Sequence, residues 1–154
     1  MTYRIEGLSP EAFESLFSMT DGELAERHAM RVIADSPSGY PCRISLRDAR
    51  PGEELVLLNH VSNDVPTPFR TAYAIYVRKD AEPASFVDEA PDYLARRTLS
   101  LRGFDESGML RQGMIAQPGE ADAQIRALFE RADIATIHAH NAAYGCFLAR
   151  IERN

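Results

Sequence analysis

The sequence predicts an α+β fold, in which helices pack on one face of a mainly antiparallel sheet. Short segments rich in β-branched and aromatic residues are joined by turn formers, as in the pair 98–104 and 109–116 around Asp105–Gly108. Helical patterns are few, and the repeated strand–helix–strand pattern of a dinucleotide-binding fold is absent. The length of 154 residues favours a single domain over residues 1–154.

Two helices are predicted near the N-terminus, and two follow later. Ser9 is a typical cap residue, Pro10 suits a first helical turn, and apolar residues then recur at helical spacing as far as Phe17. Thr20 and Glu23 match a capping box, which begins a second short helix. The later helices are predicted over residues 91–97 and 120–132.

Eight strands are predicted between turn-rich segments. Residues 35–42 are dense in Ser, Pro and Gly, and residues 63–68 contain two prolines, so both are predicted loops. The segment 70–79 is rich in Tyr, Ile and Val, which is typical of a central strand. The predicted strands are 30–34, 43–46, 54–60, 70–79, 98–104, 109–116, 134–140 and 146–152.

Composition and charge exclude several classes of function. The formal net charge is −6 and both halves of the chain are acidic, which argues against a nucleic-acid partner. The longest apolar runs, such as Leu55–Leu58, are far shorter than a membrane span. The first residues lack the pattern of a secretory signal, so we expect a cytoplasmic protein whose Cys42 and Cys146 are reduced thiols.

Two histidines near the C-terminus are candidate functional residues. His138 and His140 are two positions apart on a predicted strand, so they share a face, while Ile137 and Ala139 point toward the core. Cys146 lies on the histidine face if it pairs with residue 140, and on the apolar face if it pairs with residue 139.

A loop in the N-terminal half supplies a second group of reactive residues. Tyr40, Pro41, Cys42 and Arg43 follow Gly39 and combine an aromatic ring, a thiol and a guanidinium. We therefore predict a site between the Tyr40–Arg43 loop and the His138–Cys146 hairpin. Arg43 would bind the charge of an anionic small molecule, and Tyr40, Asn141 and Cys146 would complete the binding site.

Metal binding and thiol catalysis are alternative chemistries for this site. Cys42, His138, His140 and Cys146 would form a tetrahedral set for a divalent metal such as zinc. A catalytic metal on the two histidines would need a further ligand, and His60 is the remaining unplaced imidazole.

In the thiol hypothesis, Cys42 is the nucleophile and His138 or His140 is the acid or base. Arg43 beside Cys42 would favour the thiolate. Purely structural roles are also consistent with these residues: Cys146 as a small core residue, the histidines as a solvated face, and Asn141 as a turn former.

Several short strings occur in a fixed order over nearly the whole chain: Gly39–Arg43, Leu57–Asn59, Pro68–Arg70 with Ala74–Arg78, and His138–Asn141 with Gly145 and Cys146. Together these strings resemble a bacterial family, the domain-of-unknown-function family 1203. The resemblance implies a stand-alone bacterial protein of about this size and carries no known activity. The sequence therefore predicts a small-molecule-binding protein or enzyme, with a non-catalytic homodimeric interaction module as the alternative.

Overall fold

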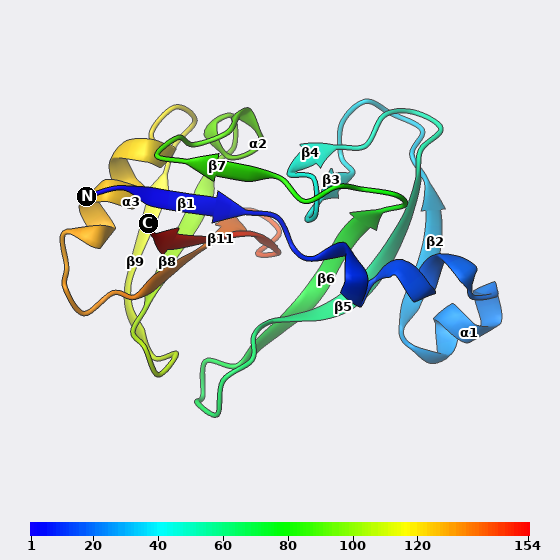
Figure 1. Ribbon diagram of the computed structural model, residues 1–154, viewed down its shortest axis with the longest axis horizontal. Coiled ribbons are helices and arrows are strands. Elements are labelled where there is room, and N and C mark those ends of the chain that lie inside the picture. Colours follow the sequence, from blue (N-terminus) through cyan, green and yellow to red (C-terminus); the bar gives the residue numbers. More distant parts are fainter.

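Two sheets lie side by side where the sequence predicted one (Figure 1). The computed structural model describes residues 1–154, of which 39% are in strands and 18% in helices. The chain is therefore rich in antiparallel sheet, as predicted, with few helices. The prediction of a single domain stays a prediction.

Five consecutive strands form one sheet, and they are inserted in the chain between the first strand of the other sheet and its remaining five strands. The strands are β1 (Tyr3–Glu6), β2 (Ala29–Ile33), β3 (Pro41–Cys42), β4 (Arg47–Asp48), β5 (Glu54–Asn63), β6 (Thr71–Arg78), β7 (Ser85–Val87), β8 (Leu99–Phe104), β9 (Leu110–Ala116), β10 (Thr136–Asn141) and β11 (Phe147–Arg153). The helices are the 3₁₀ segments η1 (Pro10–Ala12) and η2 (Glu14–Ser18), and α1 (Asp21–Glu26), α2 (Asp92–Ala95) and α3 (Ala121–Phe129).

The six-stranded sheet joins the two ends of the chain. Its order is β7-β1-β11-β10-β8-β9 and every pairing is antiparallel. The N-terminal strand β1 pairs with the C-terminal strand β11, with Tyr3 opposite Arg153. In Figure 1, β1 lies between β7 and the dark red β11. The sequence patterns missed β1 and β7 because strands of four and three residues are too short to show a period.

The five-stranded sheet is built around the long hairpin of β5 and β6. Its order is β2-β5-β6-β3-β4, with one parallel pairing between β3 and β6. The tip of the hairpin reaches the β8–β9 turn, where Asn63 Nδ2 and Thr67 Oγ1 donate to the Gly108 carbonyl at 3.5 and 3.3 Å. The hairpin therefore extends from its own sheet to the other one (Figure 1).

The helices divide between the two sheets, so the predicted layer of helices on one face of a single sheet is not confirmed. α3 packs near β8 and β9, and α1 lies against β2. The capping box of Thr20 and Glu23 begins α1, as predicted. The helix predicted from Pro10 is instead two 3₁₀ segments, interrupted at Phe13. None of the helices has the length and apolarity that crossing a membrane requires.

The segment 43–46 is a turn between β3 and β4, where the sequence predicted a strand. Leu46 N donates to the Cys42 carbonyl at 3.0 Å, and Leu46 has a left-handed φ of 49°. Arg43, Ile44 and Leu46 are nevertheless buried. This prediction failed because tertiary packing fills the turn with buried side chains, which makes the turn look like a strand in the sequence.

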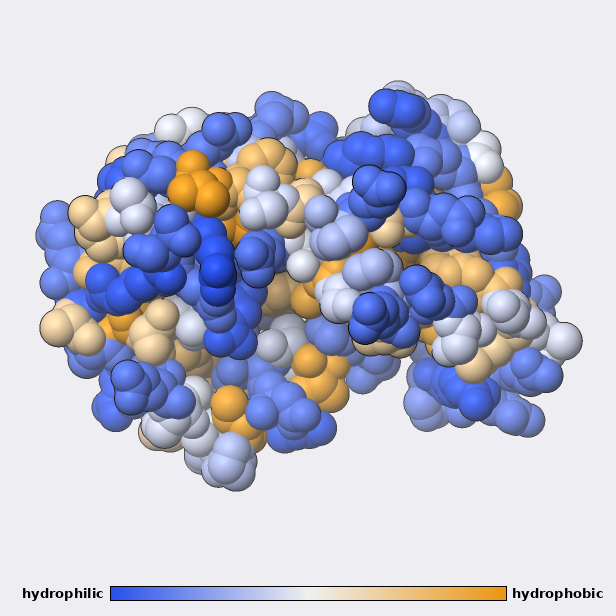
Figure 2. Space-filling view, in the orientation of Figure 1, coloured by the Kyte–Doolittle hydropathy of each residue, from blue (hydrophilic) through white to orange (hydrophobic).

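Two large apolar clusters and a small third one form the interior, and the two large clusters do not follow the sheet boundaries. The larger cluster contains Ile125 and Leu128 of α3 with Ile137 and Ala139 of β10. The smaller contains Val56, Ile75 and Val77 of the five-stranded sheet, together with Phe147 of β11. In Figure 2 the surface narrows between two lobes, and apolar residues coloured orange reach the surface there. Phe147 therefore links the cores of the two sheets.

Gly7 lies at the crossing of the chain between the two sheets, where a side chain has no room. A Cβ at this position would lie 1.7 Å from the Ile44 carbonyl oxygen, which belongs to the backbone. We expect Gly7→Ala to lower the free energy of unfolding by about 1–3 kcal/mol or more, measured by urea denaturation. The control is Gly22→Ala in α1, where the nearest atom is 3.9 Å away. Equal effects of the two substitutions would contradict the close crossing.

Candidate functional site

Arg43 brings the β3–β4 turn to the C-terminal hairpin, a contact that the predicted site requires, while the site itself stays a prediction. Its Nε donates to the Phe147 carbonyl at 2.7 Å and its Nη1 donates to the Pro41 carbonyl at 2.6 Å. The residue is only 2% exposed, and no carboxylate lies within ion-pair distance of the guanidinium. Because a buried charge without a counter-charge is costly, this arginine is the most unusual polar group in the chain.

His138 and His140 lie on one face of β10 and are both 1% exposed. The shared face is confirmed, since His138 is paired between Arg102 and Arg150, while Ile137 and Ala139 belong to the other core. The solvated-face interpretation is wrong because Phe104 and Phe147 cover the rings, with centroids 4.9 and 5.5 Å from His138.

Burial keeps both histidines neutral near pH 7. Desolvation, together with the smaller effect of the nearby charge of Arg150, lowers the pKa of His138 to about 3. Desolvation also lowers the pKa of His140, to about 4. The hydrogen bond between its Nδ1 and the Gly145 carbonyl at 2.9 Å acts in the opposite direction and raises the pKa. Because a carbonyl only accepts, His140 Nδ1 carries the proton and Nε2 the lone pair. His138 Nδ1 is enclosed and has no hydrogen-bond partner.

A third histidine joins Arg43 between the sheets. Burial lowers the pKa of His60 in β5, and the charge of Arg43 lowers it further, as it does for His140. The His60 ring centroid lies 6.3 Å from that of Phe147. We call Arg43, His60, His140 and Phe147 the junction cluster.

The junction cluster keeps unused polar atoms. Arg43 Nη2 and His140 Nε2 make no hydrogen bond within the protein, yet neither is among the fully enclosed atoms that lack a partner. The cluster therefore holds one permanent positive charge and further nitrogen atoms that the protein leaves without partners.

The other predicted site residues have structural partners. Cys42 is fully buried, and its Sγ accepts from the Arg78 backbone N–H at 3.3 Å. The Tyr40 hydroxyl donates to Asp35 at 2.6 Å. Asn141 Oδ1 accepts from the backbone N–H groups of residues 143 and 144, which is ordinary turn chemistry.

Cys146 takes neither of the two positions considered from the sequence. A bulge between Ala139 and His140 pairs His140 with Phe147, so the phenyl ring lies beside the histidines. The Cys146 carbonyl instead accepts from Asn141 N at 2.9 Å. The register was not readable from the sequence because a bulge changes the pairing by one residue.

The proposed metal ligands do not form a site in this structure. No group of three or more His, Cys, Asp or Glu side chains has an arrangement that would hold a metal ion. The set of Cys42, His138, His140 and Cys146 is therefore not assembled.

His60 and Tyr93 are the neighbours of Arg43 that the sequence patterns did not place. Tyr93 in α2 is 3% exposed, and burial raises its pKa to about 12 while the charge of Arg43 opposes this change. Alternation along β5 was a usable signal for His60, because it puts His60 on the same face as Val56 and Leu58, which pack in the smaller core. For Tyr93 we find no comparable signal in the sequence.

Comparison with known families identifies the chain. The family model described as "Protein of unknown function (DUF1203)" matches residues 39–153. The chain belongs to this family. The match confirms the resemblance found in the sequence, and the DUF1203 range contains the whole junction cluster. No curated protein matches the chain, and no solved structure does.

Stability should fall in mild acid because of the two buried histidines. An unfolded histidine binds a proton below about pH 6.5, whereas His138 and His140 stay neutral in the fold until about pH 3 and 4. Their contribution is complete above pH 6.5 and declines as the pH falls through this window. We expect a loss of about 2 kcal/mol per histidine between pH 7 and pH 5, measured by urea unfolding.

The variant His138→Leu should remove about half of this loss, since one of the two titrating groups is gone. The control is His28→Asn, because His28 is exposed and has a φ of 53° that Asn tolerates. An unchanged pH dependence in His138→Leu would contradict the neutral buried histidine.

Proposed function

We propose that this protein binds a small carboxylate at the junction cluster. The observation that carries the proposal is the buried Arg43 guanidinium, which has no carboxylate partner within the protein. A bound anion would supply the missing counter-charge, and desolvated arginine–carboxylate bonds are among the strongest in proteins.

The geometry favours a carboxylate ligand of few atoms. Nε and Nη1 of Arg43 each donate to a carbonyl group, which leaves Nη2 as its one nitrogen without a partner. A carboxylate has two oxygens and would accept one bond from Nη2 and a second from a protonated His140 Nε2. Binding would therefore be accompanied by proton uptake at His140.

Binding is better supported than thiol catalysis. Cys42 is 0% exposed and its sulfur lies against the β6 backbone, so a substrate has no path to it in this conformation. We accordingly assign Cys42 to the core of the five-stranded sheet and make no enzymatic step part of the proposal.

The proposal is tested by a histidine NMR titration of the unmodified protein with acetate or propanoate. Because an adjacent negative charge favours the imidazolium, we expect saturating carboxylate to raise the pKa of His140 by about 1 or more. Acetamide, the neutral analogue, should leave the His140 resonances unchanged, and the exposed His28 should respond to neither. Equal responses to acetate and acetamide would exclude a site for carboxylates here.

A pair of arginine variants tests the assigned residue. Arg43→Gln should abolish the response of His140 to acetate. Arg102→Gln is the control, since Arg102 is a half-buried arginine on the histidine face that, like Arg43, has no carboxylate partner. Circular dichroism and urea unfolding check that each variant folds. If Arg43→Gln folds and retains the acetate response, Arg43 is not the binding group.

A homodimer formed through β2 is the second candidate function. β2 ends the five-stranded sheet and pairs only with β5, so one edge of its backbone is free. Met30 and Ile33 on this strand are 57% and 55% exposed. A free edge with exposed apolar side chains favours pairing with a second copy of the same strand.

Sedimentation equilibrium tests the dimer. We expect a concentration-dependent dimer that Met30→Lys weakens by about tenfold or more, because a charge on an edge strand opposes strand pairing. The control is Tyr144→Lys, at an exposed position in the β10–β11 turn away from any strand edge. A monomer at all concentrations, or equal weakening by both variants, would exclude the β2 interface.

A further inference from the structure

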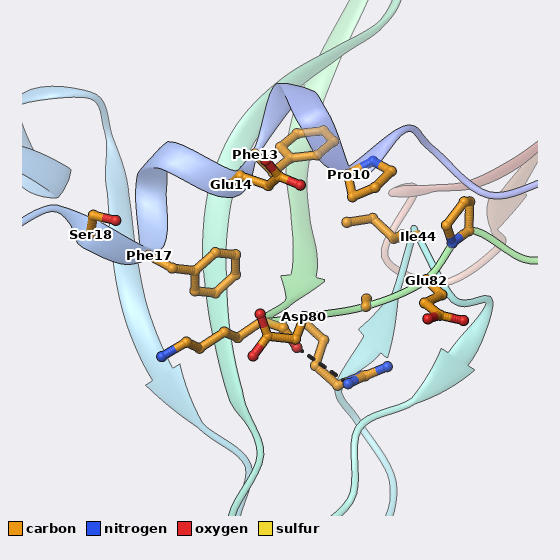
Figure 3. A pocket seen from close by; sticks show the side chains of 12 residues that line it. Pro10, Phe13, Glu14, Phe17, Ser18, Ile44, Asp80 and Glu82 are labelled. Carbon is orange, nitrogen blue, oxygen red and sulfur yellow. Dashed lines mark hydrogen bonds between the residues drawn. The ribbon is translucent and has the colours of Figure 1, made fainter.

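A cavity of about 590 Å³ lies between η1–η2 and the segment that follows β6 (Figure 3). Its volume falls within the range of about 300–1,000 Å³ that small-molecule sites occupy. Phe13 and Ile44 form a buried apolar floor, and the half-buried Phe17 extends it toward the rim. The cavity is therefore shaped for a ligand with an apolar body.

The rim of this cavity carries three carboxylates without partners. Glu14 stands on the η2 side, and Asp80 and Glu82 stand on the opposite side (Figure 3). All three are exposed, and none makes an ion pair or a side-chain hydrogen bond, although most other acidic residues near the two sheets do. The carboxylates are thus available to an incoming cation from two walls.

The two basic residues of the cavity each have an acidic partner outside it, and each shares that partner with a further arginine. Arg78 Nη1 lies 3.1 Å from Glu53, and Lys79 Nζ lies 3.5 Å from Glu54. Both glutamates belong to the start of β5 or precede it, and neither lines the cavity. With three acids and two bases, the residues that line the cavity carry a formal net charge of −1.

We propose that this cavity binds a small organic cation, an amine with an aromatic or alkyl body. The ammonium group lies between Glu14 and the pair Asp80 and Glu82, and the apolar body rests on Phe13 and Phe17. Charge complementarity selects the ligand, since an anion would meet three carboxylates and a neutral molecule would gain only from the apolar floor.

The amine site is independent of the proposed carboxylate site. The turn residue Ile44 separates the cavity from Arg43, its neighbour in sequence, and no residue of the junction cluster lines the cavity. Either site can therefore fail its test without affecting the other.

The test compares three ligands of nearly the same shape by amide NMR titration at millimolar concentrations. The probes are 2-phenylethylamine, the neutral 2-phenylethanol and the anionic 3-phenylpropanoate. We expect the amine to bind at least about fivefold more tightly than the alcohol, with shift changes centred on residues 13–18 and 78–83, and more weakly as salt is added. The anion should bind least.

Two triple variants with the same change in net charge locate the site. The first carries Glu14→Gln, Asp80→Asn and Glu82→Gln; Asn suits position 80 because Asp80 has a φ of 55°. The control carries Glu89→Gln, Glu106→Gln and Glu130→Gln, three exposed acids outside the cavity. We expect the first to weaken amine binding by about tenfold and the control to change it by less than about twofold.

Four results would overturn the proposal. The alcohol could bind as tightly as the amine, which would show an apolar cavity without charge selection. The two triple variants could weaken amine binding equally, which would show a general effect of net charge. An absence of binding by all three probes at millimolar concentrations would show that the cavity is not a binding site. Shift changes centred elsewhere on the chain would place amine binding outside the cavity.

Discussion

The structure depends on one buried cation that joins two sheets. Arg43 extends from the β3–β4 turn of one sheet to the Phe147 carbonyl of the other, and its guanidinium is held by carbonyl groups alone. Carbonyl dipoles offset only part of the several kcal/mol that burying such a charge costs. The turn conformation, the position of β11 and the contact between the sheets are therefore mutually dependent, because moving any of them would leave the guanidinium without its acceptors.

The β10–β11 bulge makes this contact possible. It places Phe147 opposite His140, on the histidine face, while Leu148 packs in the core on the other side. The ring of Phe147 then contacts His60, His138 and His140, and its carbonyl accepts from Arg43. Since Arg43 is permanently charged, protonation of His60 or His140 would add a second positive charge nearby. Without a ligand, the cluster consequently holds a single positive charge at neutral pH, and the proposed carboxylate would offset both this charge and that of a protonated His140.

Local chemistry predicted the elements whose signals lie within a few residues. The capping box at Thr20 and Glu23 and the shared face of His138 and His140 depend only on spacing, and both occur as predicted. The meeting of Arg43 with the C-terminal hairpin was also expected, although not its contact with Phe147. The predictions that failed concern features that are set by contacts between segments far apart in the sequence. β1 is stabilised by pairing with β7 and β11, the turn 43–46 is buried by both sheets, and the register of Cys146 is set by a bulge. None of these has a local signal, because the partner segments lie far away in the sequence.

The same turn separates two regions of opposite charge. Arg43 lies in the positive junction cluster, while the next residue, Ile44, forms the floor of a cavity whose rim carries unpaired carboxylates. Phe13 also lies between the two regions, because its ring contacts His60 on one side and lines the cavity on the other. The junction cluster lies wholly within the matched family range, whereas η1 and η2 precede residue 39 and supply one cavity wall. Carboxylate binding would thus be a property of the DUF1203 region itself, and amine binding would require the N-terminal segment packed against it.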